Sequence, residues 1–221
     1  AAAGAAIEIN GNITGGGNNL ALISGSGATT VSGNAAGLGT VTLQSDVAGA
    51  TGTVRFEGNF EAASVTTYGR AYEVGFTGDA ATVTNAVTFD NTGNLILGDA
   101  YTDEFIFNGG VTHTAGDTTL SGTLQTSDDA ITLDNLTLGS DSIIRSLDAA
   151  AGAEIAINGT ITGNAHDLTI ISGNGTTTVS GDAAGLGAVT LQSDVAGATG
   201  TISFEGGFTA TSITTYGRGY D

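Results

Sequence analysis

Ile7 to Gly15 reads IEINGNITG, and Ile155 to Gly163 reads IAINGTITG. The two stretches belong to a long repeat, because residues 1–73 align with residues 149–221 at a constant offset of 148 positions (155 − 7) without a gap. About 52 of the 73 aligned pairs are identical. A fixed period of this kind is typical of stacked repeat units. We therefore divide the chain into a first complete unit, residues 1–148, and the first half of a second unit, residues 149–221, and expect the two to be continuous in one body.

Both quoted stretches have two apolar residues at positions i and i+2 and a glycine at i+4. The same pattern occurs in VRFEGNF (Val54 to Phe60), FIFNGGV (Phe105 to Val111) and ISFEGGF (Ile202 to Phe208). Alternation with a period of two predicts short strands, and glycine beside asparagine or aspartate predicts tight corners. No segment has the sustained 3.6-residue apolar period of a helix. The sequence therefore predicts an all-β fold.

Two all-β architectures have strands at this spacing. One is a series of β-sandwich domains, and the other is a parallel β-solenoid, in which each coil of two or three strands bonds to the next. Short strands, 37 glycines and the absence of tryptophan favour a narrow coil over a sandwich core. The expected fold is a right-handed parallel β-helix, with about seven coils and about 34 Å of length in each 148-residue unit.

The chain is strongly acidic, with 22 Asp and Glu against 4 Lys and Arg and a net charge of −18. This charge repels a phosphate backbone and argues against nucleic acid as a partner. No apolar run reaches the ~20 residues of a spanning helix, so membrane insertion is not expected. The chain also contains no cysteine, so it has no disulfide framework. Because the sequence starts and ends within the pattern, we expect a segment of a longer exported product.

Several stretches resemble the β-strand repeats of very large exported bacterial proteins of the filamentous-haemagglutinin-like and giant-adhesin kind. The resemblance is carried by IEINGNITG and by FIFNGGVTHT (Phe105 to Thr114), GTTTVSGDAAGLGAVTL (Gly175 to Leu191) and SITTYG (Ser212 to Gly217). It implies a surface-anchored or secreted β-helical fibre of a Gram-negative-type cell, with a role in adhesion, biofilm or sheath. It supplies no catalytic residues.

One recurring motif is a candidate for contact with a partner. Tyrosine and arginine gather in it, and both residue types are frequent at interface hot spots. The members are Tyr68, Arg70 and Tyr72, with their counterparts Tyr216, Arg218 and Tyr220. The alternative is that the tyrosines cover a corner of the coil while the arginines offset nearby acids.

A second candidate is a group of carboxylates that would suit Ca²⁺, which prefers oxygen ligands at loop corners. These residues are Asp99, Asp103, Glu104, Asp128 and Asp129. No EF-hand loop and no calcium-binding nonapeptide is present. The alternative is a solvated acidic face, and no cofactor is then required.

Catalysis is not expected, because acid–base chemistry at paired carboxylates needs a nearby cation and the chain has no lysine and four scattered arginines. We expect His113 and His166 to be surface residues. Thr-x-Thr pairs begin at Thr40, Thr82, Thr112 and Thr160, with intervals of 42, 30 and 48 residues. These unequal intervals argue against a regular threonine face of the ice-binding kind.

Taken together, the sequence predicts a structural segment of an extracellular or cell-surface fibre, sheath or adhesin stalk. The expected partner is the protein itself, through end-to-end or lateral association, since an open sheet edge has unpaired backbone groups. The alternative function is an adhesin module that binds carbohydrate or another surface.

Overall fold

The computed structural model describes residues 4–45, 47–146, 151–193 and 195–216. Within these ranges it contains only strands, turns and irregular segments, with no helix. The strands are β1 (Ile7–Ile9), β2 (Ile13–Thr14), β3 (Leu20–Leu22), β4 (Thr29–Val31), β5 (Ala35–Leu43), β6 (Thr53–Phe56), β7 (Phe60–Thr66), β8 (Glu73–Phe76), β9 (Ala80–Val83), β10 (Val87–Thr88), β11 (Leu95–Leu97), β12 (Glu104–Phe107), β13 (Val111–His113), β14 (Thr118–Gln125), β15 (Ile131–Leu133), β16 (Leu136–Arg145), β17 (Ile155–Ile157), β18 (Ile161–Thr162), β19 (Leu168–Ile171), β20 (Thr177–Val179), β21 (Ala183–Leu191), β22 (Ile202–Phe204) and β23 (Phe208–Thr215).

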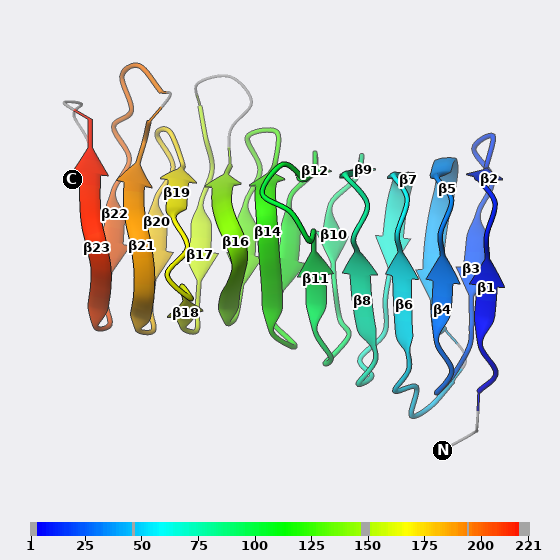
Figure 1. The fold of residues 1–221 in the computed structure, drawn as a ribbon. Helices are drawn as coiled ribbons and strands as arrows, with labels where there is room; N and C mark the ends of the chain where they lie inside the picture. Colours follow the sequence, from blue (N-terminus) through cyan, green and yellow to red (C-terminus); the bar gives the residue numbers. More distant parts are fainter. Residues whose placement is uncertain (1–3, 46, 147–150, 194, 217–221) are drawn as a thin grey trace.

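The strands stack in parallel as a β-solenoid of about nine coils. In Figure 1 the chain rises on the near side, crosses the top and descends on the far side while it advances from right to left, which is the right-handed sense. The fold is therefore the right-handed parallel β-helix that the sequence predicts. A series of sandwich domains is excluded, because sandwich sheets are antiparallel.

Each coil has three faces, which we number in chain order from β1, and each face is a ladder of paired strands. The inward residues of face 1 begin with Ile7, Thr29, Val54, Val74, Leu95, Thr118 and Leu136. Those of face 2 begin with Ile13, Ala35, Phe60, Ala81, Phe105 and Leu124. Those of face 3 include Leu20, Val41 and Val65, then Val87, Val111, Ile131 and Ile155. Long strands such as β5 and β21 bend around a corner and belong to two faces.

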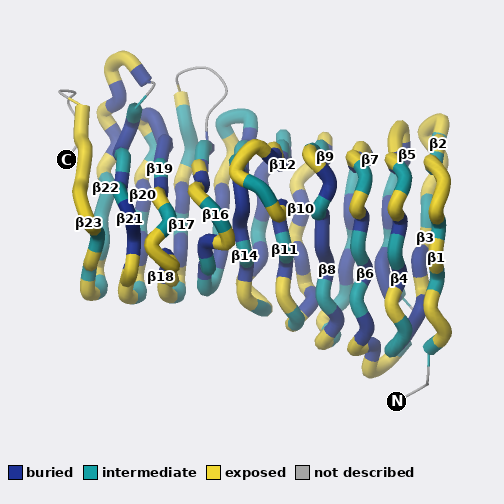
Figure 2. The backbone as a smooth tube through the Cα atoms, viewed as in Figure 1, coloured by how far each residue is buried: buried dark blue, intermediate teal, exposed yellow. Residues whose placement is uncertain are grey.

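The main apolar core runs along the axis from one coil to the next. Buried and exposed residues alternate along the strands, as Figure 2 shows, because successive side chains point to opposite sides of a strand. Aromatic rings fill the middle coils: Phe56 stacks on Phe76 at a centroid distance of 5.5 Å, and Phe76 meets Phe89 edge-on at 6.2 Å.

Glycines stack at the corners, where a side chain would collide with the coil below. A Cβ atom on Gly33 would lie 2.5 Å from the carbonyl oxygen of Gly11, and one on Gly58 would lie 2.6 Å from that of Gly33. Beside them the Asn12 side-chain oxygen accepts a hydrogen bond from the Asn34 amide at 2.9 Å. The Gly and Asn residues that predicted corners from the sequence therefore hold successive coils together.

The two repeat units do not occupy the same faces. Six coils lead along face 1 from Ile7 to Leu136, and two further faces lead from Leu136 to Ile155 in β17, which pairs on face 3. The 148-residue repeat therefore has six and two-thirds coils, which span about 32 Å at the ~4.8 Å strand spacing. This value agrees with the estimate of about seven coils.

The same local contacts recur at different corners in the two units. Gln44 and Gln192 have the left-handed backbone angles φ 58° and φ 56°. The Gln44 side-chain oxygen accepts from the Gly25 amide at 2.9 Å, and that of Gln192 accepts from the Gly173 amide at 2.9 Å. Because one corner structure serves two different vertices, these two vertices of the coil are interchangeable.

Candidate functional site

A row of threonines lies on the outer side of face 3 in the first unit. Each one is the central residue of an inward–Thr–inward triplet whose flanking side chains are buried. The members are Thr42 (β5), Thr66 (β7), Thr88 (β10), Thr112 (β13) and Thr132 (β15). We call these five residues the threonine ladder.

The threonine ladder is regular in space, because each member lies one coil further along the axis than the member before it. Thr42 pairs with Thr66, Thr88 pairs with Thr112, and Thr112 pairs with Thr132; β7 and β10 are themselves in contact. Adjacent members therefore lie about 4.8 Å apart along the axis. Beyond Thr132 the outward residues of face 3 are Ala156, Thr178 and Ser203.

No charged residue points outward from the strands of face 3 in the part of the chain that the structure describes. The other faces differ: Glu8 and Arg55 point outward on face 1, and Glu61 does so on face 2. A threonine hydroxyl both donates and accepts, and its methyl group is apolar. The ladder is thus a narrow, neutral, hydroxyl-bearing strip on a chain of net charge −18.

Sequence reasoning missed this ladder because it compared Thr-x-Thr pairs, whose intervals are unequal. The informative signal is a threonine between two inward residues, as in VTL, VTT, VTF, VTH and ITL. These triplets recur at 24, 22, 24 and 20 residues (66 − 42, 88 − 66, 112 − 88, 132 − 112), and the corners absorb the differences in length.

The tyrosine motif is only partly available for contact. Tyr72 is fully buried, its hydroxyl donates to the Leu43 carbonyl at 3.2 Å and accepts from the Tyr68 amide at 3.0 Å, so its prediction as a contact residue is wrong. Burial also raises the pKa of Tyr72. Arg70 lies over the Tyr68 ring at 5.4 Å, with both side chains half-buried. Tyr216 is 40% exposed.

The remaining members of the motif, Arg218 and Tyr220, lie outside the described residues. The motif therefore offers Tyr68, Arg70 and Tyr216 as surface groups, and the role of these three in partner contact stays a prediction.

The carboxylates proposed for Ca²⁺ lie at two different corners. Asp103 is buried and caps its own loop, since its carboxylate accepts from the amides of Asp99 at 2.9 Å and Ala100 at 3.0 Å. Glu104 begins β12 and is exposed. Asp99, Asp103 and Glu104 thus belong to the corner between faces 1 and 2.

Asp128 and Asp129 lie at the corner between faces 2 and 3 in the following coil, where the Asp128 carboxylate accepts from the Gly152 amide at 2.9 Å. Among the described residues no three Asp, Glu, His or Cys side chains gather as a metal site would need. The structure therefore does not bring the five predicted Ca²⁺ ligands together.

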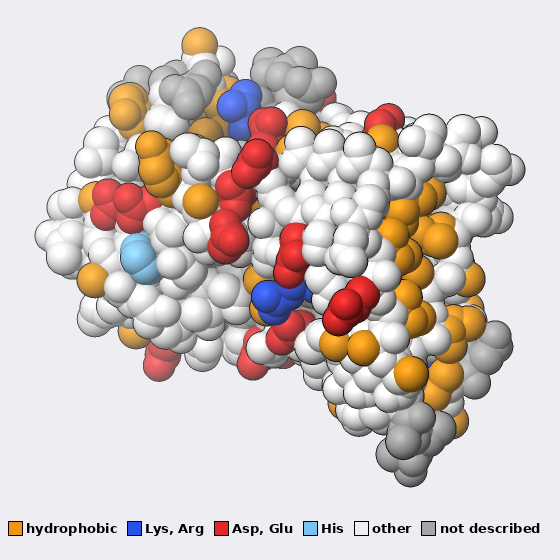
Figure 3. Space-filling model, turned by 45° about the vertical axis from the view of Figure 1, so that its right-hand side comes forward, with side chains coloured by type: hydrophobic (Ala, Val, Ile, Leu, Met, Phe, Trp, Pro, Cys, Tyr) orange, Lys and Arg blue, Asp and Glu red, His pale blue; other side chains and the backbone are white. Residues whose placement is uncertain are grey.

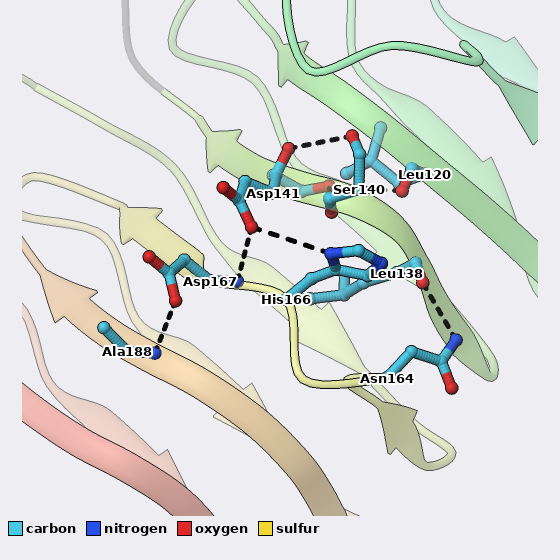
Figure 4. Close-up of polar contacts among 9 residues, drawn as sticks. Leu120, Leu138, Ser140, Asp141, Asn164, His166, Asp167 and Ala188 are labelled. Atoms are coloured by element: carbon cyan, nitrogen blue, oxygen red, sulfur yellow. Dashed lines mark hydrogen bonds and ion pairs between the residues drawn. The ribbon is translucent and has the colours of Figure 1, made fainter.

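Carboxylates also form part of a hydrogen-bonded ladder at a corner where the first unit passes into the second (Figure 4). The Asp141 carboxylate accepts from the Asp167 amide at 2.9 Å, and the Asp167 carboxylate accepts from the Ala188 amide at 2.6 Å. The half-exposed His166 lies 3.7 Å from Asp141. In the first unit Asn19 takes the place of Asp167 and accepts from Thr40 at 2.8 Å. These acids therefore have a structural role that an amide also fills.

His113 is buried in the core, which corrects its prediction as a surface residue. Its Nδ1 lies 2.9 Å from the Thr118 hydroxyl, and its Nε2 lies 3.2 Å from the Asn91 carbonyl oxygen. The carbonyl accepts, so Nε2 carries the proton in the neutral ring. Burial lowers the pKa of His113.

A groove crosses the surface at the corner of faces 1 and 2 in the first unit. It is lined by Asn34, Ala36, Asn59, Phe60, Glu61, Ala80 and Thr82. Its polar residues are not retained in the second unit, where Asp182, Gly207 and Thr209 take the places of Asn34, Asn59 and Glu61. The groove is therefore not a feature of every repeat. Figure 3 shows that acidic side chains gather in a band across the visible surface.

No family model, no curated protein and no solved structure matches this chain. Within the described ranges, no helix has the length and apolar character to cross a membrane.

Proposed function

We propose that this chain is a structural segment of an extracellular bacterial fibre, sheath or adhesin stalk, and that its role is mechanical. The observation that carries the proposal is the continuity of the solenoid across the junction of the two units. Strands of the first unit pair directly with strands of the second, as in Leu136 with Ile161 and Ser142 with Leu168. Further units would lengthen the same body and add no separate domain.

The hydrogen bonds of such a body run along its axis, because strands of successive coils pair in parallel. Each coil is also held by its corner side chains and by a core that continues through all coils. An acidic outer surface keeps rods hydrated and apart. These properties suit a stiff spacer, and a spacer needs neither a catalytic group nor a cofactor.

The proposal is tested by electron microscopy of native material with gold-labelled antibodies raised against the 221-residue chain. We expect label along filaments or a coat outside the cell. Label confined to the cell interior would overturn the proposal, and an antibody preadsorbed with the chain serves as control.

A carbohydrate- or surface-binding adhesin module is the second candidate. It is favoured by Tyr68 with Arg70, since this motif recurs as Tyr216 with Arg218. If it is correct, replacing Tyr68, Arg70, Tyr216 and Arg218 together by alanine will abolish binding of the chain to a polysaccharide array without changing its unfolding temperature. Unchanged binding would contradict it.

A further inference from the structure

The last coil of the solenoid exposes apolar side chains that are buried at the equivalent place in the first unit. This coil consists of β22 and β23, at the left end of Figure 1. Phe204 is partly exposed and Ile213 is 52% exposed, whereas their counterparts Phe56 and Val65 are 1% and 5% exposed. In the first unit the next coil covers these positions, through β8 and β10. The last coil therefore has the form of a surface that accepts another coil.

The first coil, which consists of β1, β2 and β3, lacks a covering coil on its other side. Ile7 and Ile13 are partly exposed, whereas their counterparts Ile155 and Ile161 are 0% and 1% exposed. In the second unit β15 and β16 cover these two positions. Within the described ranges, no strand pairs with the outer edge of either end coil. Each end coil thus presents an open sheet edge around an apolar centre.

The joint between the two repeat units shows how two such surfaces fit together. There the coil β15–β16 lies under the coil β17–β18–β19, with pairing on faces 3, 1 and 2 in turn. The last coil has the same arrangement, because β22 lies on face 3 and β23 lies first on face 1 and then on face 2. The first coil, β1–β2–β3, is the counterpart of β17–β18–β19. A first coil therefore fits on a last coil in the way that the second unit fits on the first.

We propose that the last coil of one copy of this chain binds the first coil of a second copy, head to tail, in the register of the internal joint. The inference rests on the proposed fibre function, because it names the contact through which rods lengthen. The contact joins two different surfaces, so it does not close and repeats from copy to copy. The inward residues that pair, last coil named first, are Ile202 with Ile7, Phe204 with Ile9, Phe208 with Ile13 and Ile213 with Leu20.

Backbone hydrogen bonds favour a second copy as the occupant of these surfaces. At the internal joint the Asn158 amide donates to the Leu133 carbonyl at 2.9 Å. The corresponding groups in the end coils are the Asn10 amide and the Phe204 carbonyl, and added strands bind open sheet edges through such pairs. A single extended peptide pairs with one face only. A coil of this chain pairs with all three faces and also covers the apolar centre between them.

Charge favours contact at the ends over contact at the sides. Two chains of net charge −18 repel each other, and the repulsion is smallest where few charges approach. The first coil, residues 4–23, contains one acidic residue, Glu8, and the last coil, residues 200–216, contains one, Glu205. Glu8 lies on the outer side of face 1 and Glu205 is exposed at a corner, so neither enters the apolar centre of the contact. The negative charge of the chain therefore opposes lateral packing more than end-to-end binding.

One corner of the proposed contact offers a substitution that acts on the contact alone. In the glycine stack of this corner, a Cβ atom on Gly33 would lie 2.5 Å from the carbonyl oxygen of Gly11, and one on Gly206 would lie 2.4 Å from that of Gly181. Gly11 begins the stack, and its Cβ position has nothing within 4 Å in a single chain. In the head-to-tail contact Gly11 lies on Gly206 of the other copy. Gly11→Ala therefore leaves the single chain intact and collides only across the contact.

Sedimentation velocity of the 221-residue chain at increasing protein concentration measures the contact. The wild type is expected to form a series of species at multiples of 21.6 kDa, without a limiting size. Gly11→Ala blocks the first coil, and the collision is expected to weaken association by about tenfold or more. Ile213→Lys blocks the last coil, since it places a charge among apolar side chains of the contact.

Thr214→Lys is the matched control for Ile213→Lys. Thr214 pairs with Thr190, whose neighbours Val189 and Leu191 are buried, so it lies on the outer side of the same strand. It adds the same charge outside the apolar centre and is expected to associate as the wild type does. Unfolding temperatures within a few degrees of the wild type establish that all variants are folded.

A mixture of the two blocked variants separates head-to-tail contact from lateral association and from contact between like ends. Gly11→Ala keeps an intact last coil, and Ile213→Lys keeps an intact first coil. At a concentration where the wild type assembles, each variant alone is expected to stay single. Their equimolar mixture is expected to give pairs and nothing larger.

Four results overturn the proposal. The wild-type chain stays single at every concentration up to its solubility limit; the two blocked variants, both folded, assemble as the wild type does; Thr214→Lys reduces assembly as much as Ile213→Lys; or the mixture of blocked variants gives no pairs. None of these results bears on the antibody labelling, because filaments built from covalently continuous repeats would be labelled equally.

Discussion

The first and second repeat units have nearly the same sequence, yet the solenoid places them on different sides. Phe56 and Phe60 meet at 4.6 Å on one corner, and their counterparts Phe204 and Phe208 meet at 4.6 Å on another. The strand pairing is preserved as well, since Ile13 pairs with Ala35 and Ile161 with Ala183. Local sequence therefore determines each strand and corner, and the total strand count determines which face a strand occupies.

The comparison is sharpened most by removing an aromatic ring from each unit. Phe56→Ala is expected to cost about 4 kcal/mol of unfolding free energy, because the ring is buried and leaves a cavity. Phe204→Ala is expected to cost about half as much, since its ring is partly exposed. Chemical denaturation monitored by circular dichroism measures both. Equal losses of unfolding free energy in the two variants would mean that the stacking of Phe56 on Phe76 does not stabilise the fold.

Glycine substitutions at equivalent corners come next in size. Gly33→Ala and Gly181→Ala are each expected to cost about 2–3 kcal/mol, because the new Cβ atom meets backbone of the preceding coil at 2.5 Å and 2.4 Å. Gly11→Ala is the control, since nothing lies within 4 Å of its Cβ position. Denaturant midpoints report the losses. If Gly33→Ala lowered the denaturant midpoint and Gly181→Ala did not, the two corners would not be equivalent.

Substitution of the corner glutamines is expected to lower the unfolding free energy by a smaller amount, and by the same amount in the two units. Gln44→Ala and Gln192→Ala are each expected to cost about 2 kcal/mol, because each leaves two buried backbone amides without an acceptor. Gln125→Ala, on the outer side of β14, is the control. Thermal unfolding of the three variants compares them directly, and a difference between Gln44 and Gln192 would show that the two vertices are not interchangeable.

His113, whose position has no counterpart within residues 149–221, supplies the smallest effect. Its pKa is lowered by burial, so the unfolded chain binds more protons than the folded chain below its ordinary pKa of about 6.5. Stability is therefore complete above that pH and decreases as the pH falls below it. His113→Leu, which copies Leu133 in the next coil, should remove this contribution. Unfolding temperatures between pH 7 and pH 5 test it, and an identical pH dependence in both proteins would contradict it.

Much of the fold follows from the sequence because its signals are local. The period-two strands, the Gly and Asn corners and the 148-residue repeat all predict a parallel β-helix, and the structure agrees. The position of each coil boundary did not follow as well, since corners range from two residues between Leu133 and Leu136 to ten between Leu191 and Ile202. The number of residues in a stretch therefore does not directly give the number of coils that it forms.

The candidate sites were harder to predict, because they depend on which residues share a face. Tyr72 and His113 have polar groups, and polar residues are expected at the surface, yet both point into the core. Asp103 and Asp128 lie at different corners of successive coils, with face 2 between them. The position of His113 in Val-Thr-His, parallel to Ile-Thr-Leu at residues 131–133, was the available sign of its burial.

Interchangeable vertices have a consequence for how such genes change in length. Where one corner structure fits more than one vertex, as with Gln44 and Gln192, a duplication or deletion need not comprise a whole coil. Adding or losing a single strand with its corner preserves the hydrogen-bonded stack and only turns everything downstream by a third of a revolution. Unequal recombination within the gene is then tolerated at breakpoints between single strands as well as between whole coils.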